Sequence, residues 1–227
     1  MRIASFLFAS AVLACSVYGQ VSRDEAIQIA EAYLRFEWTP SVSNAFHGLD
    51  PDGIQVDTPD VSLVKSGTRP GWWIPNQVNQ GVPYKWGGFS SLEEFSAGLK
   101  QGMYAGDIYT AEKRRLDNAA VSKHVVGIDC SGLVSRCWKL ERAYSTYEFN
   151  ALCDPLGSYA DLKPGDILNV PNKHVLLFKE FANEPKDRIL AYEAGSPPTW
   201  KVLLNSIPVT MLEKEGYVPL RYRKVRD

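Results

Sequence analysis

The sequence lacks an excess of charge of either sign. Its 227 residues include 25 Lys and Arg and 26 Asp and Glu, which gives a formal net charge of -1 at pH 7. No basic stripe stands out along the chain. Because proteins that hold nucleic-acid phosphates present clustered basic side chains, a nucleic-acid partner is not expected.

Long apolar runs are also missing after the first residues. The chain begins with Met1-Arg2, continues with an apolar run from Ile3 to Ala14 and reaches small residues before Gly19-Gln20. This pattern predicts a secretory signal peptide over residues 1–19. No later stretch approaches the roughly 20 apolar residues of a transmembrane helix. We therefore expect an exported chain, periplasmic or secreted, with no transmembrane segment.

Cysteine is scarce, and its four positions differ in context. Val12-Leu13-Ala14-Cys15 resembles a lipoprotein signal in part, so a lipid anchor at Cys15 is the alternative to a cleaved leader. Cys130, Cys137 and Cys153 remain, an odd number in a compartment that permits disulfides. Two hypotheses stay open: a Cys137–Cys153 bridge that leaves Cys130 free, and two buried free cysteines.

The tetrapeptide Asp129-Cys130-Ser131-Gly132 stands where an extended segment gives way to a helix. Lys123 to Ile128 is extended in character, whereas apolar residues recur at helical spacing from Leu133 to Leu140. At a helix N-terminus the macrodipole and the free backbone N–H groups favour a thiolate. Cys130 is therefore a candidate nucleophile, and a small buried hydrophobe is the alternative.

Only three histidines can act as the base that a nucleophilic cysteine needs. His174 follows a turn and a short strand and begins the next strand, so its ring is expected at the rim of a sheet, facing the nucleophile helix. His47 and His124 are expected to be surface or structural residues.

Glu193 is the candidate for the third catalytic group. It ends the predicted strand 189–193, and an adjacent strand would bring it beside His174. A carboxylate there holds the imidazole in the productive tautomer and stabilises the imidazolium. An exposed carboxylate that pairs with a neighbouring base is the alternative.

The two halves of the chain have different patterns. Ser22 and the alternation that follows it predict a capped amphipathic helix, and residues 38–81 predict ordered loops and short strands. Short apolar or alternating runs then predict an antiparallel sheet of about five strands: 166–170, 175–181, 189–193, 201–207 and 218–222. We expect an α+β fold in which the nucleophile helix packs on this sheet.

Four acidic residues in the loop-rich segment raise the question of calcium: Asp50, Asp52, Asp57 and Asp60. Their spacing departs from a calcium loop because Gly53 follows Asp52 directly. Solvated Asx-type turns are the preferred interpretation, and no metal site is predicted.

Four motifs together resemble the NlpC-type cysteine peptidases, a papain-like family of bacterial cell-wall endopeptidases. In chain order they are Gly81-Val82-Pro83-Tyr84-Lys85-Trp86-Gly87-Gly88, Ile128-Asp129-Cys130-Ser131-Gly132-Leu133-Val134, Leu162-Lys163-Pro164-Gly165-Asp166-Ile167 and His174-Val175. Their order and context match the family across about residues 80 to 222. The resemblance implies an N-terminal extension at 20–80 and a catalytic domain at 81–227.

The resemblance also implies roles for particular residues. Cys130 would be the nucleophile and His174 the base. Tyr84 would lie near the thiol and donate to the oxyanion, and Asp129 and Ser131 would help to bind the substrate.

The implied activity is cleavage of an amide in a peptidoglycan stem peptide or muropeptide, at the bond between D-glutamate and a diamino acid. It would proceed through a thioester, with no metal or organic cofactor. An amidase or acyltransferase acting on another amide or lipid, and a non-catalytic cell-wall-binding protein, are the alternatives.

Two departures from the family pattern stand out. Residues 89–128 intervene between the Gly-Gly pair and the nucleophile, and this insert is expected to shape the substrate groove. The family commonly has His, Asn or Gln at the third catalytic place, where this chain offers Glu193. The nearby Trp72, Trp73 and Trp86 are expected in the core, with a place in the groove as the alternative.

Overall fold

The structure is a computed structural model, and it describes residues 20–63, 71–195 and 199–227. The predicted signal peptide and the lipid-anchor alternative at Cys15 lie outside the described residues. Within the three described ranges, no helix has both the length and the apolar character needed to cross a membrane.

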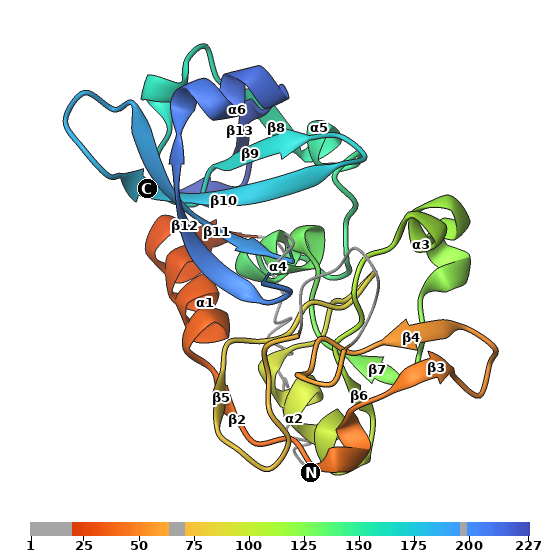
Figure 1. Ribbon diagram of the computed structural model, residues 1–227. Helices are drawn as coiled ribbons and strands as arrows, with labels where there is room; N and C mark the ends of the chain where they lie inside the picture. The colour runs from red at the N-terminus through yellow and green to blue at the C-terminus, as the bar shows by residue number, and fades with distance from the viewer. Residues whose placement is uncertain (1–19, 64–70, 196–198) are drawn as a thin grey trace, which may run out of the picture.

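Six antiparallel strands form the main sheet, in the spatial order β12-β11-β10-β9-β13-β8 (Figure 1). Their bounds are β8 (Cys153–Pro155), β9 (Ile167–Val170), β10 (His174–Phe181), β11 (Arg188–Ala194), β12 (Val202–Pro208) and β13 (Val218–Tyr222). Five strands follow the five predicted runs. The sixth, β8, is a three-residue edge strand ending in proline, too short to give a periodic signal. The prediction of mixed helices and an antiparallel sheet is confirmed.

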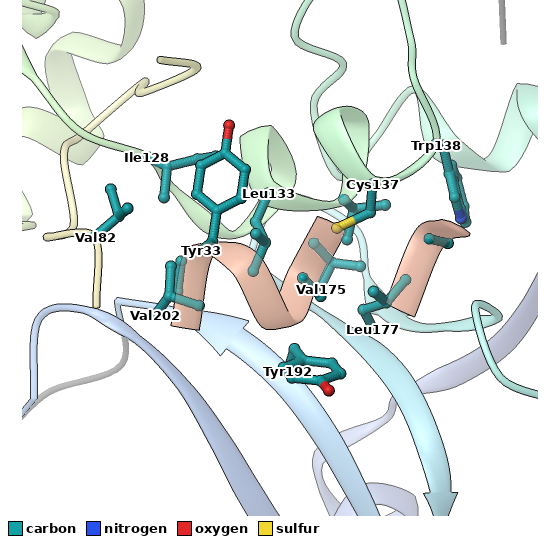
Figure 2. Packing of buried hydrophobic residues seen from close by; sticks show 14 of the residues in the cluster. Tyr33, Val82, Ile128, Leu133, Cys137, Trp138, Val175, Leu177, Tyr192 and Val202 are labelled. Carbon is teal, nitrogen blue, oxygen red and sulfur yellow. The ribbon is translucent and has the colours of Figure 1, made fainter. Parts of the chain in front are cut away.

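Helices α1 (Arg23–Arg35) and α4 (Cys130–Cys137) contact each other and pack against the main sheet (Figure 1). Figure 2 shows how the core between them is filled: Leu133 and Cys137 of α4 lie over Val175 and Leu177 of β10, and Tyr192 of β11 closes the layer. Burial of these side chains holds α4 on the sheet.

Helix α1 begins where the sequence predicts. The Ser22 hydroxyl accepts from the Glu25 backbone N–H at 3.1 Å, and the Ser22 N–H donates to the Glu25 carboxylate at 2.9 Å. This reciprocal capping box satisfies two backbone donors at the helix start. The shorter helices α5 (Phe149–Leu152) and α6 (Val209–Glu215) flank the sheet, and β1 (Val21–Ser22) pairs in parallel with β14 (Val225–Arg226).

The extension and the insert fold together into one unit, here named the loop lobe (residues 36–63, 71–80 and 89–128). The extension contributes β2 (Glu37–Trp38), β3 (His47–Leu49), β4 (Gln55–Asp57) and β5 (Asn79–Gln80). The insert contributes α2 (Leu92–Lys100), β6 (Tyr104–Ala105), α3 (Ala111–Leu116) and β7 (Val125–Val126). Two short 3-10 helices of the loop lobe lie at Val42–Asn44 and Asp117–Ala120, and a third, at Tyr159–Asp161, lies before β9.

Hydrogen bonds between distant residues join the two parts of the loop lobe. The Asn44 side chain donates to the carbonyls of Leu99 and Met103 at 3.1 and 2.7 Å. The Trp73 indole donates to the Ala105 carbonyl at 3.1 Å. The extension is therefore packed against the insert and does not form a separate appendage.

Two of the four acidic loop residues form the predicted turns, but both are buried and not solvated, and Asp57 ends the strand β4. The Asp50 carboxylate accepts from the backbone N–H groups of Asp52 and Ile54, each at 2.9 Å. The Asp60 carboxylate accepts from the Ser62 N–H at 2.8 Å. These contacts are those of Asx turns, in which a carboxylate replaces a backbone acceptor.

Gly132 lets α4 pack closely on the segment that carries Tyr84. A Cβ atom at Gly132 would lie 2.0 Å from the Gly88 carbonyl oxygen, well inside van der Waals contact. The substitution Gly132→Ala is therefore expected to lower the free energy of unfolding by about 1–3 kcal/mol, measured by urea denaturation.

Gly157→Ala is the matched control. A Cβ there meets only a side-chain oxygen of Asp161 at 3.7 Å, so the change should stay within about 0.5 kcal/mol. An equal loss in both variants would contradict the packing argument.

Candidate active site

The segment from Pro83 to Gly88 holds the start of α4 in place. The Ile128 N–H donates to the Pro83 carbonyl and the Lys85 N–H to the Ile128 carbonyl, both at 3.1 Å. The Asp129 N–H donates to the Gly88 carbonyl at 3.1 Å. These bonds bring Tyr84 close to Cys130, although the whole insert separates them in sequence.

Asp129 caps the helix α4. Its Oδ1 accepts from the Gly132 N–H at 2.6 Å and from the Ser131 hydroxyl at 2.8 Å. Burial raises the pKa of the Asp129 carboxyl above its usual range, against the lowering effect of these hydrogen bonds. Both residues thus stabilise the helix start, and substrate binding by them stays a prediction.

Cys130 is the first residue of α4 and is half-buried. The structure brings it together with His174, the first residue of β10, and with Glu193 of β11. His174 Nε2 lies 2.7 Å from Glu193 Oε2, and the Glu193 side chain is buried at 4% exposure. Because Nε2 faces the carboxylate, Nδ1 is the ring nitrogen left for the thiol.

The charge on His174 is set by these neighbours. Burial lowers the pKa of its imidazole, but the charge of Cys130, a hydrogen bond with Cys130 and the bond to Glu193 together raise the pKa to about 10. Near neutral pH the ring is therefore an imidazolium that lies between Cys130 and Glu193.

Tyr84 is held by close packing near the same point. Its ring lies directly on Gly195, where a Cβ would come within 1.7 Å of a ring carbon, and it packs against Trp200 at 5.6 Å between centroids. Burial, followed by the charges of Asp129 and Cys130, raises the pKa of Tyr84 well above its usual range. The phenol therefore stays protonated and can act as a hydrogen-bond donor.

Two further residues belong to the site, and the sequence analysis missed both. The Asn205 amide of β12 donates to Glu193 Oε1. Lys85 lies beside the start of α4, where its N–H donates to the Ile128 carbonyl. Burial lowers the pKa of its side chain, while the charges of Asp107 and Asp129 oppose that effect. The strand register is the only signal that points to Asn205, and it is not visible in the sequence.

The other two histidines lie in the loop lobe. His47 Nε2 lies 3.0 Å from the Asp60 carboxylate, and His124 Nε2 lies 3.0 Å from that of Asp52. They are structural or surface residues, as predicted. Among the tryptophans, Trp73 is fully buried in the core, whereas Trp72 and Trp86 are only partly buried.

One group of residues has the chemistry of metal ligands. Asp50, Asp52 and His124 each offer an atom within 4.8 Å of the others. Asp50 accepts from the Ser122 hydroxyl at 2.6 Å, and Asp52 pairs with Lys123 at 3.1 Å. Both carboxylates already have protein partners, so the geometry gives no reason to place a metal there.

The disulfide hypothesis is wrong in this structure. Cys137 and Cys153 are both free and buried, which agrees with the alternative of two buried thiols. Burial raises the pKa of Cys137 well above its usual range and that of Cys153 to about 12. Neither thiol is therefore available as a thiolate near neutral pH.

No family model, no curated protein and no solved structure matches the chain. The four motifs and the geometry around Cys130 are therefore the basis on which a function is proposed.

Alkylation by iodoacetamide at pH 7 is expected to modify Cys130 rapidly and to leave Cys137 and Cys153 unmodified in the folded protein. The physical reason is the imidazolium beside Cys130 and the burial of the other two thiols. Peptide mass spectrometry locates the label.

The substitution His174→Ala should slow the labelling of Cys130 by about 10-fold or more, because it removes the positive partner of the thiolate. Equal labelling of all three thiols in the folded wild-type protein would refute this account of the site.

Proposed function

We propose that the chain is an exported, papain-like cysteine peptidase of the NlpC type. Its substrate is the peptidoglycan stem peptide or muropeptide, cleaved at the amide between D-glutamate and a diamino acid. The observation that carries the proposal is the row of Cys130, His174 and Glu193, with the thiol at the N-terminus of a helix that packs on an antiparallel sheet.

The first half of the reaction forms a thioester. The Cys130 thiolate attacks the amide carbonyl, and the electron pair of the carbonyl moves onto its oxygen. The Tyr84 hydroxyl and the Cys130 backbone N–H donate to this oxyanion. The intermediate collapses, the C–N bond breaks, and the His174 imidazolium gives its proton to the leaving amine.

The second half releases the acyl product. Neutral His174 takes a proton from a water molecule, which attacks the thioester. The C–S bond breaks, and the thiolate and imidazolium are restored. Glu193 holds the imidazole in the orientation and tautomer that both halves need.

The alternative functions of the same site would give different products. An amidase or acyltransferase would form the same thioester from another amide or a lipid, whereas a wall-binding protein would form none. Analysis of digested muropeptides by mass spectrometry separates these functions.

The substitution Cys130→Ala should abolish the release of new amino termini from purified sacculi, because no other residue supplies the nucleophile. Cys153→Ala, which changes a buried thiol on the edge strand β8, should keep the wild-type activity once circular dichroism shows that it is folded. Full activity of the Cys130→Ala protein would rule out the proposal.

The substitution Tyr84→Phe keeps the ring on Gly195 and removes only the hydroxyl donor. It is expected to lower kcat by about 100- to 1000-fold with little change in KM, because the lost bond forms in the transition state. Tyr147→Phe, which changes an exposed tyrosine in the turn before α5, is the control and should change neither constant. A rise in KM alone would assign Tyr84 to substrate binding.

A further inference from the structure

The register of three neighbouring strands sets His174, Glu193 and Asn205 beside one another. On β11 and β12, Glu193 pairs with Leu203, and Ala191 pairs with Asn205. Cross-strand partners share one face of a sheet, and so do residues two apart on a strand. Glu193 and Asn205 therefore lie on the same face, one diagonal step apart, within reach of each other's side chains.

The contacts fill both oxygens of the Glu193 carboxylate. Oε2 lies 2.7 Å from His174 Nε2, and Oε1 accepts from the Asn205 Nδ2–H. Glu193 is buried at 4% exposure, while Asn205 is half-buried. A carboxylate in such a place needs donors, because an ionised group without them loses its hydration at a high free-energy cost.

We infer that Asn205 is a positioning residue of the catalytic row: its amide fixes the Glu193 carboxylate and keeps it ionised, so that His174 remains an imidazolium. The inference rests on the proposed function and extends the row by one member. Hydrogen bonding to a charged carboxylate favours the charged form, and the ionised carboxylate in turn favours the charged imidazole.

The identity of the third group explains why a fourth member is needed. A neutral amide in the place of Glu193 would orient the imidazole, and it would carry no charge of its own that a further donor has to stabilise. A carboxylate gives a stronger interaction with the imidazolium, but its second oxygen must also be satisfied in the buried position. Asn205 provides that donor from the adjacent strand.

The direct test is an NMR titration of the imidazole rings. The chain has three histidines, so the His174 signal is assigned by its loss in His174→Gln. The substitution Asn205→Leu keeps the branched shape of the side chain and removes the donor, and it should lower the pKa of His174 by about 1 unit. Asn205→Gln keeps an amide and should restore part of the shift.

Ser206→Ala is the matched control, since Ser206 is the next residue on β12, is exposed and points to the opposite face. It should leave the titration of His174 unchanged. If Leu at position 205 prevents folding, Asn205→Ala removes the same donor with less bulk. A His174 titration that is the same in the wild-type and the folded donor-less variant overturns the inference.

Kinetics on muropeptides give the second readout. Loss of the Asn205 donor should lower kcat by about 10-fold with little change in KM, and the alkaline limb of the pH profile should move to lower pH. Partial unfolding would reduce the active fraction without moving that limb.

The two tests separate the inference from the proposed function. If the titration shifts but no muropeptide is cleaved, the proposed function fails and the role of Asn205 stands. If cleavage occurs and the titration does not shift, only the role of Asn205 fails.

Discussion

The burial of the Glu193 carboxyl group is the constraint on which the site depends. Removing a carboxylate from water costs several kcal/mol unless close donors replace the lost hydration. His174 and Asn205 face its two oxygens, and the pairing of β10, β11 and β12 decides where they stand. On the opposite face of β11, Tyr192 packs with the core beneath α4 (Figure 2). A slip of one residue in this register would therefore move Tyr192 out of this core and separate His174, Glu193 and Asn205 at the same time.

The loop lobe contacts the site through the backbone on either side of Tyr84. The Asp107 N–H donates to the Tyr84 carbonyl at 2.8 Å, and the Trp86 N–H donates to the Asp107 carbonyl at 3.0 Å. The Asp107 side chain is itself anchored by Lys113 at 2.6 Å and by the Asp57 N–H at 3.1 Å. The insert thus supports the backbone that carries Tyr84, and its expected role in shaping the substrate groove stays a prediction.

Local signals made part of this architecture predictable. The change from an extended run to a helical apolar pattern marked the start of α4, and the alternating runs marked five strands, because both patterns depend on neighbours in sequence. Adjacent strands were enough to place Glu193 beside His174. Asn205, the edge strand β8 and the packing of the extension on the insert were missed. Each depends on register or on contacts between residues far apart, which one sequence does not encode locally.

The charge on Cys130 also decides when His174 holds its proton in the proposed reaction. In the resting site the largest cause that raises the pKa of His174 is the charge of Cys130, followed by its hydrogen bond and by Glu193. An imidazolium with a pKa of about 10 is a weak acid.

Attack on the carbonyl moves the negative charge from the Cys130 sulfur to the oxyanion, next to the Tyr84 hydroxyl. The largest cause that raises the pKa of His174 is therefore lost at the step in which the leaving amine needs the proton. Once the thioester has formed, the sulfur is neutral, and His174 is left as a base for water with only Glu193 to orient it. In the proposed reaction the same ring therefore alternates between acid and base, because the charge on Cys130 is lost when the thioester forms and returns when the thioester is hydrolysed.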